Sequence, residues 1–431
     1  MFEVREKPQM VQRALLISIF EAKDDQVEAA LLLEELEELV STLGIGVVGS
    51  FLIKTRARHK RFICGTGKAE EIAELARAHE ADCVVFDNQL APSQQRAWEA
   101  VTDITVIDRE EVILDIFAQR AQTREASLQV DLARMQYALP RMAKMWGHLD
   151  REGGGGGGSG AASRGMGEQQ IEIDRRLARQ RISRLKGELE LVRKQRATQR
   201  KERERYSIPH AAIVGYTNAG KSSLLNLLSG SEIMAKDMLF ATLDTTTRRV
   251  ELPDGQPLLL TDTVGFVRNL PHRLVEAFKA TLEEAVIADF LIHVLDAASD
   301  QVDQFKATTE KVLEELGAGD KPMILVFNKI DLIDPERLKG LKLAHPHACF
   351  ISVREDEGVQ SLVDACATQL RGRIRRLSFK LPHSRGDLVN LLHQEGKVLS
   401  TDYEEDGTLI LAAVPASIAG MLSDFVADED A

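Results

Sequence analysis

GYTNAGKS, residues Gly215–Ser222, is the stretch that decides the fold of the central part of the chain. It matches the pattern G-x-x-x-x-G-K-[ST], follows the apolar run AAIV and precedes the helix-like run SSLLNLLS. The glycines let successive backbone N–H groups curve around an anion, and the N-terminus of the following helix adds its positive dipole end. The sequence therefore predicts a strand, a phosphate-binding loop and a helix, which are the parts of a P-loop α/β domain with a mostly parallel sheet.

Two side chains at the end of this loop have predicted chemical roles. Lys221 is expected to place its ammonium group against the β- and γ-phosphates of a nucleotide, and Ser222 to coordinate Mg²⁺ through its hydroxyl. The loop alone does not choose between ATP and GTP.

The base is selected by a second loop, Asn328-Lys329-Ile330-Asp331, which follows the buried-strand run MILVF. A carboxylate at Asp331 accepts two hydrogen bonds from guanine, from N1–H and from the exocyclic amine. Adenine lacks that pair of donors, so a site built around this carboxylate rejects it. Asn328 and Lys329 are expected to brace the loop and cover the base.

A third loop, Asp262-Thr263-Val264-Gly265, follows the predicted strand Leu258–Thr261 and fits the pattern D-x-x-G. Asp262 is expected to hold Mg²⁺ through a water molecule, and the Gly265 amide to sense the γ-phosphate. The next residue, Phe266, stands where Ras-type switches have a glutamine that orients the attacking water. Phenylalanine cannot hydrogen-bond water, so intrinsic hydrolysis is predicted to be slow and to need groups from a partner.

Between these loops lies FATLD, residues Phe240–Asp244, followed by further threonines. One threonine is expected to ligate Mg²⁺ and close over the γ-phosphate; Thr242 is the first choice and Thr246 the alternative. The run Ile351-Ser352-Val353-Arg354 ends a strand where a Ser-Ala-Lys-like loop would contact guanine.

The first part of the chain alternates short β-branched runs with amphipathic helical stretches, which predicts βαβ units and a parallel sheet. We expect strands at residues 13–20, 46–55, 83–87 and 105–108, and helices at 24–43, 68–79 and from 110 onward. The glycine-containing Gly65–Lys68 is either a strand-to-helix turn or a second nucleotide site.

A glycine run, Gly153–Gly158, interrupts two helical segments at Thr123–Trp146 and Glu168–Arg205. The second segment spaces apolar residues by three and four, which predicts a helical hairpin with a coiled-coil-like seam. The residues of this seam are Ile171, Ala178, Ile182, Leu185, Leu189 and Val192. Residues 164–205 hold 14 Lys and Arg against 7 Asp and Glu. This basic arm is either a solvated helix face or a surface that meets RNA phosphates.

Bulk composition sets the remaining limits. The chain has 431 residues, enough for two to four domains, and a net charge of −12, which argues against coating of nucleic acid by the whole surface. No apolar run approaches the roughly 18 residues of a membrane span, and no secretory signal is visible at the N-terminus. The four scattered cysteines have no metal-ligand spacing and are expected to be buried and reduced.

Long strings of the sequence resemble the HflX family of GTPases, in the Obg-like branch, whose members carry a hydrophobic residue in place of the catalytic glutamine. The similar strings are Gly65–Ile72, Phe86–Arg96, Ile113–Arg141, Ser163–Arg176, Gly215–Leu228, Leu239–Arg249, Thr261–Glu284 and Leu381–Gly396. Within them, RGMGEQQIE stands where the family usually has RGPGETQLE, and SVR replaces an SA-type loop.

This resemblance implies a cytoplasmic GTPase that binds GTP or GDP with Mg²⁺ and associates with the large ribosomal subunit and its rRNA. The N-terminal domain and arm would reach toward the peptidyl-transferase region, and the family's role is to split or rescue stalled ribosomes under stress. Thr242 is the switch threonine by likeness of FATLD to the FTTL of Obg. We expect a monomer without a membrane span.

The expected domains are an N-terminal α/β domain (1–122), a helical hairpin arm (123–206, with its tip at 153–167), a P-loop GTPase domain (207–375) and a small α+β domain (376–431). The catalytic residues are expected to be Lys221, Thr242 and Gly265, and the metal ligands Ser222, Thr242 and Asp262. The predicted nucleotide contacts are Gly215, Tyr216, Thr217, Asn218, Ala219, Gly220, Lys221, Ser222, Phe240, Ala241, Thr242, Leu243, Asp244, Asp262, Thr263, Val264, Gly265, Asn328, Lys329, Ile330, Asp331, Ser352, Val353 and Arg354.

Two other functions stay open at this point. The chain could be a GTP-dependent interaction switch for a non-ribosomal protein, with hydrolysis incidental. An RNA-modifying GTPase would need a cofactor pocket or a nucleophile in the N-terminal domain, and the sequence shows neither.

Overall fold

The computed structural model describes residues 11–21, 23–142, 162–205, 208–230, 239–240, 243–253, 255–269, 279–370, 374–404 and 406–427. These residues fall into two compact units. The first holds the described residues up to Val192 together with those of 236–244 and 267–280, and the second holds the rest.

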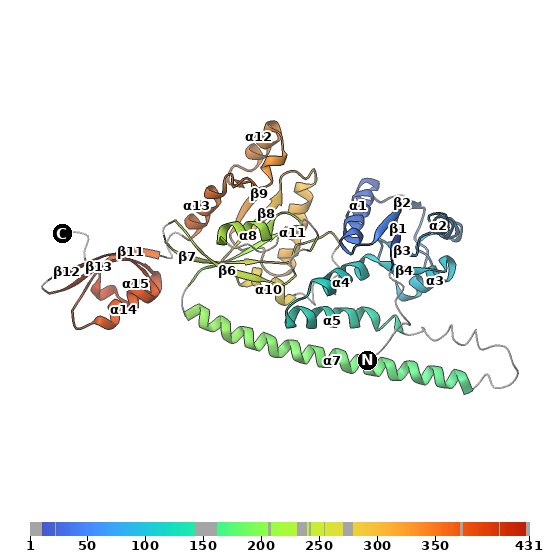
Figure 1. Ribbon diagram of the computed structural model, residues 1–431, viewed down its shortest axis with the longest axis horizontal. Coiled ribbons are helices and arrows are strands. Elements are labelled where there is room, and N and C mark those ends of the chain that lie inside the picture. Colours follow the sequence, from blue (N-terminus) through green and yellow to red (C-terminus); the bar gives the residue numbers. More distant parts are fainter. Residues whose placement is uncertain are drawn as a thin grey trace. The chain divides into compact units, whose positions relative to one another are not determined.

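A parallel four-stranded sheet with strand order β2-β1-β3-β4 forms the centre of the first unit (Figure 1). Its elements are β1 (Arg13–Glu21), α1 (Gln26–Thr42), β2 (Gly46–Thr55), α2 (Thr66–Ala78), β3 (Cys83–Phe86), α3 (Pro92–Thr102), β4 (Thr105–Asp108) and α4 (Arg109–Arg120). The predicted strands and helices are confirmed, with ends that differ by at most two residues for the elements whose two ends were predicted, but α3 was not predicted.

The central strand β1 is buried on both faces, which explains its unbroken apolar sequence. Leu15 and Ile17 pack in one cluster with Ile72 of α2 and the fully buried Trp98 of α3. Helices therefore shield this sheet as they do in other parallel α/β folds.

Helix α5 (Arg124–Ala138) packs against the long helix α7 (Ala162–Arg205). Leu185 and Leu189 of α7 meet Leu132 of α5, with Ile182 beside them, so the predicted seam holds at these positions. The side chain of Ile171 and the glycine run lie outside the described residues. One expectation was wrong: residues 162–167 were assigned to the tip of the hairpin but belong to α7. The apolar spacing that predicted this helix begins only at Ile171, and the helix extends beyond it toward the N-terminus.

A six-stranded sheet with order β10-β9-β8-β5-β7-β6 forms the centre of the second unit. Strand β6 runs antiparallel to β7, and the other neighbours are parallel. Its elements are β5 (His210–Gly215), α8 (Lys221–Ser229), β6 (Thr246–Glu251), β7 (Pro257–Asp262), α10 (Lys279–Ile287), β8 (Phe290–Asp296), α11 (Val302–Glu315), β9 (Met323–Asn328), the 3₁₀ turn η2 (Ile330–Leu332), α12 (Pro335–Ala344), β10 (Cys349–Phe350) and α13 (Val359–Gln369).

The alternation of side chains along β8 divides the core of this sheet. Ile292 and Val294 pack with Leu224 of α8 and Leu362 of α13, whereas Leu295 belongs to a second cluster with Val302 of α11. The sheet is thus covered on both faces, and the edge at the carboxyl ends of its parallel strands is left for loops.

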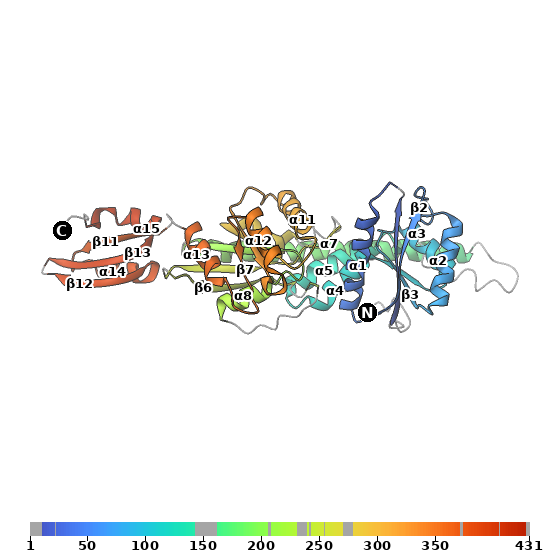
Figure 2. The same ribbon diagram turned by 90° about the horizontal axis from the view of Figure 1, so that it is seen from above.

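A small three-stranded antiparallel sheet, order β11-β13-β12, follows (Figure 2). Its elements are β11 (Ile374–Leu381), α14 (Gly386–Glu395), β12 (Lys397–Glu404), β13 (Gly407–Pro415), α15 (Ala416–Met421) and the 3₁₀ turn η3 (Ser423–Phe425). Residues of α14 and α15 pack on one face of β13, through Ile410, Ala412 and Val414. The predicted α+β character is confirmed, but β11 and β12 were missed, because their charged and polar residues mask the strand pattern.

Among the described residues, no helix is long and apolar enough to cross a membrane. All four cysteines are buried as free thiols, as their scattered spacing predicted. Burial raises the pKa of Cys64 to about 11, which keeps that thiol protonated and unreactive.

Candidate guanine-nucleotide site

The carboxyl ends of β5, β7, β9 and β10 share one edge of the six-stranded sheet, and the loops predicted to hold the nucleotide leave from them. Because these strands are parallel, residues far apart in sequence meet at this edge. The structure joins four of the predicted segments by hydrogen bonds: 215–222, 262–265, 328–331 and 352–354.

The phosphate loop has a backbone that requires its glycines. Gly215 has φ +147° and Gly220 has φ +94°. A Cβ on Gly215 would overlap the backbone carbonyl of Val294 in β8, and one on Gly220 would overlap the amide nitrogen of the Asn328 side chain. The loop can therefore lie against both neighbours only where side chains are absent.

Lys221, the first residue of α8, is buried and donates a hydrogen bond from Nζ to the backbone carbonyl of Tyr216 at 2.7 Å. Burial lowers the pKa of this lysine to about 8, and the nearby Asp262 carboxylate opposes the shift. Gly265 approaches so closely that a Cβ built on it would lie 2.9 Å from Lys221 Nζ. The ammonium group is thus enclosed between the loop and the D-x-x-G segment.

Ser222 and Asp262 form the predicted metal-binding pair. Ser222 Oγ donates to Asp262 Oδ2 at 2.6 Å. A hydroxyl and a carboxylate oxygen beside a phosphate loop are ligands that suit Mg²⁺, which prefers hard oxygen donors. Thr263 turns away from this pair and donates to the backbone carbonyl of Ile213, while Val264 is buried.

Asn328 bridges the loops. Its Nδ2 donates to the carbonyl of Ala219 in the phosphate loop at 2.9 Å, and its Oδ1 accepts from the Val353 amide at 3.1 Å. Lys329 has φ +65°, and its Nζ lies 2.8 Å from Asp296 Oδ2 at the end of β8. One buried amide side chain therefore sets the distance between the phosphate loop and the 352–354 loop.

The carboxylate of Asp331 is held by a serine. Ser352 Oγ donates to Asp331 Oδ1 at 2.6 Å and accepts from the Glu355 amide at 3.1 Å. Ile330 is buried and donates from its backbone to Ile351 at 3.3 Å. Arg354, in contrast, is exposed and lies near Glu355.

Phe266 is buried at 1% exposure and forms a short parallel bridge with the phosphate loop. Its N–H donates to Gly215 O at 3.1 Å, and its carbonyl accepts from the Thr217 amide at 2.8 Å. Its side chain offers no hydrogen-bonding group, as the sequence predicted.

The FATLD segment has its described contacts in the first unit. Ala241 and Thr242 lie outside the described residues, so the choice between Thr242 and Thr246 stays a prediction; Thr246 pairs with Asp262 in the β6–β7 ladder. Phe240 packs edge-to-face on Phe117 of α4, with ring centroids 4.6 Å apart, and Leu243 is buried.

Asp244, the last residue of that segment, was expected to contact nucleotide. In the structure its carboxylate accepts from the backbone of Gln122 at 2.9 Å and from the backbone and hydroxyl of Thr123, the N-cap of α5. An anionic side chain at a helix N-terminus stabilises the exposed N–H groups there.

Sequence reasoning missed three residues around the site. Phe305 of α11 stacks on Tyr216 with centroids 3.9 Å apart, and Asp296 pairs with Lys329. His293 of β8 is fully buried, and burial lowers its pKa to about 3, with further lowering by Lys306 and Lys221. Asp296 had a signal: like Asp262 and Asn328, it is a polar residue that ends a buried strand.

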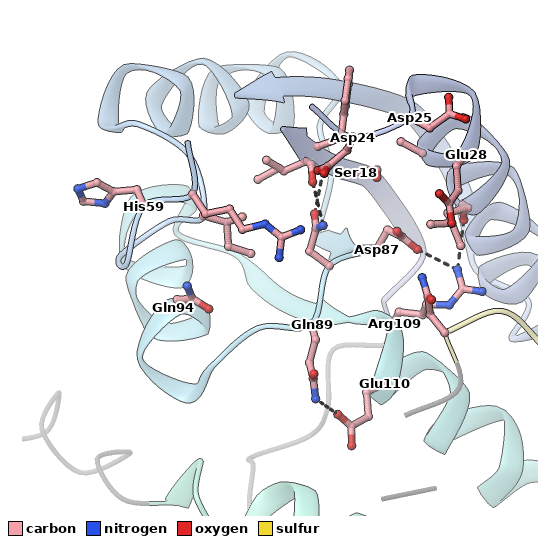
Figure 3. A pocket seen from close by; sticks show the side chains of 18 residues that line it. Ser18, Asp24, Asp25, Glu28, His59, Asp87, Gln89, Gln94, Arg109 and Glu110 are labelled. Atoms are coloured by element: carbon pink, nitrogen blue, oxygen red, sulfur yellow. Dashed lines mark hydrogen bonds and ion pairs between the residues drawn. The ribbon is translucent and has the colours of Figure 1, made fainter. Parts of the chain in front are cut away.

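A cavity of about 600 Å³ lies at the corresponding edge of the first unit's sheet (Figure 3). Residues that follow β1, β3 and β4 line it, as expected where connections leave β1 and β3 in opposite directions. Its acidic lining residues are Asp24, Asp25, Glu28, Asp87 and Glu110.

The cavity's arginines are already paired, Arg109 with Asp87 and Arg58 with Glu21. Its carboxylates therefore disfavour a phosphate group. Gly65 is the N-cap of α2 and Gly67 lies in the first turn of that helix, where Lys68 pairs with Glu71.

A parallel sheet with a glycine-rich phosphate loop, a Ser–Asp pair and a guanine-type N-K-x-D loop at one edge defines the class of P-loop GTPases. Family models agree along the chain. Residues 31–118 match "GTP-binding GTPase N-terminal", 120–203 match "GTP-binding GTPase Middle Region", and 210–329 match "50S ribosome-binding GTPase".

Whole-length relatives identify the family. The chain is 62% identical to GTPase HflX of Akkermansia muciniphila, over 99% of this chain and 100% of the relative. It is 42% identical to GTPase HflX of Lacrimispora saccharolytica (98% of each chain) and 40% identical to that of Escherichia coli (93% of this chain, 92% of the relative). The chain belongs to the HflX family of GTPases, and it binds and hydrolyses GTP.

Proposed function

We propose that the edge of the six-stranded sheet binds one GTP with Mg²⁺, with its phosphates on 215–222 and its guanine between 328–331 and 352–354. The observation that carries this is the double hydrogen bond of Asn328 to Ala219 and Val353. It ties the phosphate loop to the base-reading loop at a fixed spacing, as one bound nucleotide requires.

Each side chain then has a role in phosphoryl transfer. Lys221 leaves the Tyr216 carbonyl and stabilises charge on the β- and γ-phosphate oxygens, while the Gly265 amide contacts the γ-phosphate. Ser222, Thr242 and, through water, Asp262 would hold Mg²⁺, which neutralises charge on those oxygens. Asp331, oriented by Ser352, pairs with guanine.

Phe266 cannot orient the attacking water, so the intrinsic turnover is slow and a partner raises it. We propose that this partner is the large ribosomal subunit. Support comes from the description of the model that matches 210–329 and from the basic arm, whose Arg181 and Arg184 are exposed. Basic side chains on a long helix suit contact with rRNA phosphates.

We further propose that the protein acts as a monomer in the cytoplasm, where it splits or rescues stalled ribosomes under stress. We propose the division into an N-terminal domain (1–122), an arm (123–206), a GTPase domain (207–375) and a C-terminal domain (376–431) as its working parts.

Steady-state GTP hydrolysis measured with separated small and large ribosomal subunits tests this proposal. We expect large subunits to raise the rate at least about tenfold and small subunits to have little effect. A flat titration, with tight binding to a non-ribosomal protein instead, would support the interaction-switch alternative.

A further inference from the structure

Thr217 of the phosphate loop carries a buried hydroxyl that has no hydrogen-bond partner. The residue is only 6% exposed, and its Oγ1 makes no hydrogen bond within the part of the chain that the structure describes. Its backbone amide is engaged, because it donates to the Phe266 carbonyl at 2.8 Å. A buried polar group without a partner costs free energy of folding. In a loop that binds nucleotide, such a hydroxyl indicates a partner that arrives with the ligand.

The side chain of Thr217 lies beside the two groups that are assigned to the γ-phosphate. The Cβ position of Gly265 is 2.8 Å from the Thr217 methyl carbon and 2.9 Å from Lys221 Nζ. The threonine and the lysine therefore flank the same point of the D-x-x-G segment. All three residues belong to one compact unit. Thr217 thus stands where the proposed function places the reacting phosphate.

The other polar side chains of this loop are placed differently. Ser222 is assigned to the metal ion and bonds to the carboxylate that begins D-x-x-G. The ring of Tyr216 stacks on Phe305 of α11, with ring centroids 3.9 Å apart. Asn218 is exposed at the surface of the loop. Thr217 is consequently the buried hydroxyl of the loop that is available to a ligand.

The chemistry of a hydroxyl fits the task that Phe266 cannot perform. The glutamine of Ras-type switches orients the attacking water, whereas Phe266 is apolar and 1% exposed. A threonine hydroxyl has one donor and two acceptor lone pairs, so it can accept from a water molecule and donate to a phosphate oxygen. Rotation of the side chain between staggered rotamers exchanges the positions of methyl and hydroxyl. The hydroxyl can therefore face the point beside Lys221 and Gly265.

We propose that Thr217 is a catalytic residue whose hydroxyl orients the water that attacks the γ-phosphorus, in place of the glutamine that this chain lacks. The inference rests on the proposed nucleotide site. The water oxygen forms a bond to the γ-phosphorus while the bond from that phosphorus to the β–γ bridging oxygen breaks. The bridging oxygen keeps the electron pair and leaves with GDP, and the protons of the water end on the released phosphate. The threonine is unchanged by the reaction.

Single-turnover hydrolysis of radiolabelled GTP by the full chain tests this role. Thr217→Val removes the hydroxyl and keeps the branched shape, whereas Thr217→Ser keeps the hydroxyl. We expect Thr217→Val to lower the rate at least about tenfold and Thr217→Ser to stay within about threefold of the parent protein. GDP affinity, measured by calorimetry, should change by less than about twofold in both variants, because GDP lacks the phosphate that the water attacks.

Thr309→Val is the matched control. Thr309 of α11 is also fully buried, and its hydroxyl likewise has no partner among the described residues. Both valine variants replace an unpaired hydroxyl with a methyl group, so neither should lower the melting temperature. Only Thr217→Val should lower the rate of hydrolysis. A Thr217→Val protein that binds GDP and hydrolyses GTP within about threefold of the parent rate would overturn the proposal, and so would an equal loss in Thr309→Val.

Binding of GDP with aluminium fluoride gives a second readout, because the fluoride complex imitates the phosphoryl group under attack by water. Thr217→Val should weaken binding of this complex at least about tenfold relative to GDP alone, and an unchanged ratio would overturn the proposal. If valine disturbs GDP binding, Thr217→Ala takes its place in both measurements, since the smaller side chain fits the same space. Failure of the parent protein to bind GDP would instead contradict the proposed nucleotide site.

Discussion

The chain contains one parallel sheet and one mostly parallel sheet, and the edges at the carboxyl ends of their parallel strands differ in chemistry. At the edge of the six-stranded sheet, β5 leads into α8 through a loop with two positive-φ glycines and a buried lysine. At the edge of the four-stranded sheet, β1 leads into α1 through residues 22–25, which include no glycine, and Asp25 caps the helix by accepting from the Val27 amide at 2.8 Å.

The difference shows that a strand–turn–helix arrangement does not by itself bind phosphate. A glycine-rich loop such as that of the first edge can curve backbone N–H groups toward an anion, whereas at the second edge the carboxylate of Asp25 itself accepts from the N–H of Val27. Nucleotide chemistry thus follows the residues of the turn, even where the topology is shared.

The largest expected effect is on GTP turnover, and it distinguishes two lysines that lie at the start of a helix, Lys221 of α8 and Lys68 of α2. Lys221→Ala should reduce GTP turnover about 1000-fold, because the charge on the transferred phosphate loses its buried partner. Lys68→Ala should leave turnover unchanged, since Lys68 is exposed and pairs with Glu71. Equal losses in a radiolabelled GTP hydrolysis assay would point to a second nucleotide site at Gly65–Lys68 and break the comparison.

The next comparison concerns base preference and uses one carboxylate from each sheet edge. Asp331→Asn should shift preference from GTP toward xanthosine triphosphate on the order of 100-fold, because the 2-oxo group of xanthine needs a donor. Asp24→Asn, in the acidic cavity, should leave base preference as it is. Competition binding with the two triphosphates measures both, and retained guanine specificity in Asp331→Asn would contradict the assigned loop.

A third comparison concerns the stability cost of adding a side chain at Gly220 and at Gly65. Gly220→Ala should destabilise the fold by about 2 kcal/mol and weaken GDP binding, since its φ is +94° and a Cβ would displace Asn328. Gly65→Ala should cost less than about 0.5 kcal/mol, because a Cβ there meets open space. Urea unfolding with and without GDP gives both values; similar costs would mean that the phosphate loop is not constrained as described.

The smallest effect concerns pH. Burial lowers the pKa of Lys221 to about 8 in the nucleotide-free protein, and a bound phosphate should raise it again. Below pH 8 the lysine is already protonated, so affinity is flat; above pH 8 binding takes up a proton, and GDP affinity falls by up to about tenfold per pH unit. Calorimetry at pH 8.5 in buffers of different ionisation enthalpy should detect this uptake, and its absence would place the lysine outside the phosphate site.

Local patterns predicted much of this molecule. The phosphate loop, D-x-x-G and N-K-x-D each follow an apolar strand, so their meeting at one sheet edge followed from topology alone. Strands β11 and β12 were missed, because charged residues interrupt the alternation on which the pattern depends. The hydrogen bonds of Asp244 to Gln122 and to Thr123, the N-cap of α5, join residues about 120 positions apart, which no local pattern reports.

The sequence by itself determined the class of ligand, because glycines, a lysine and an aspartate at short spacings specify phosphate and guanine chemistry without reference to distant residues. Only the tertiary structure decided what holds the backbone of Arg268. The bonds from Arg109 and Glu35 to the Arg268 backbone exist because separate elements bury charges that must find partners, and a backbone group carries no side-chain identity for a sequence to show.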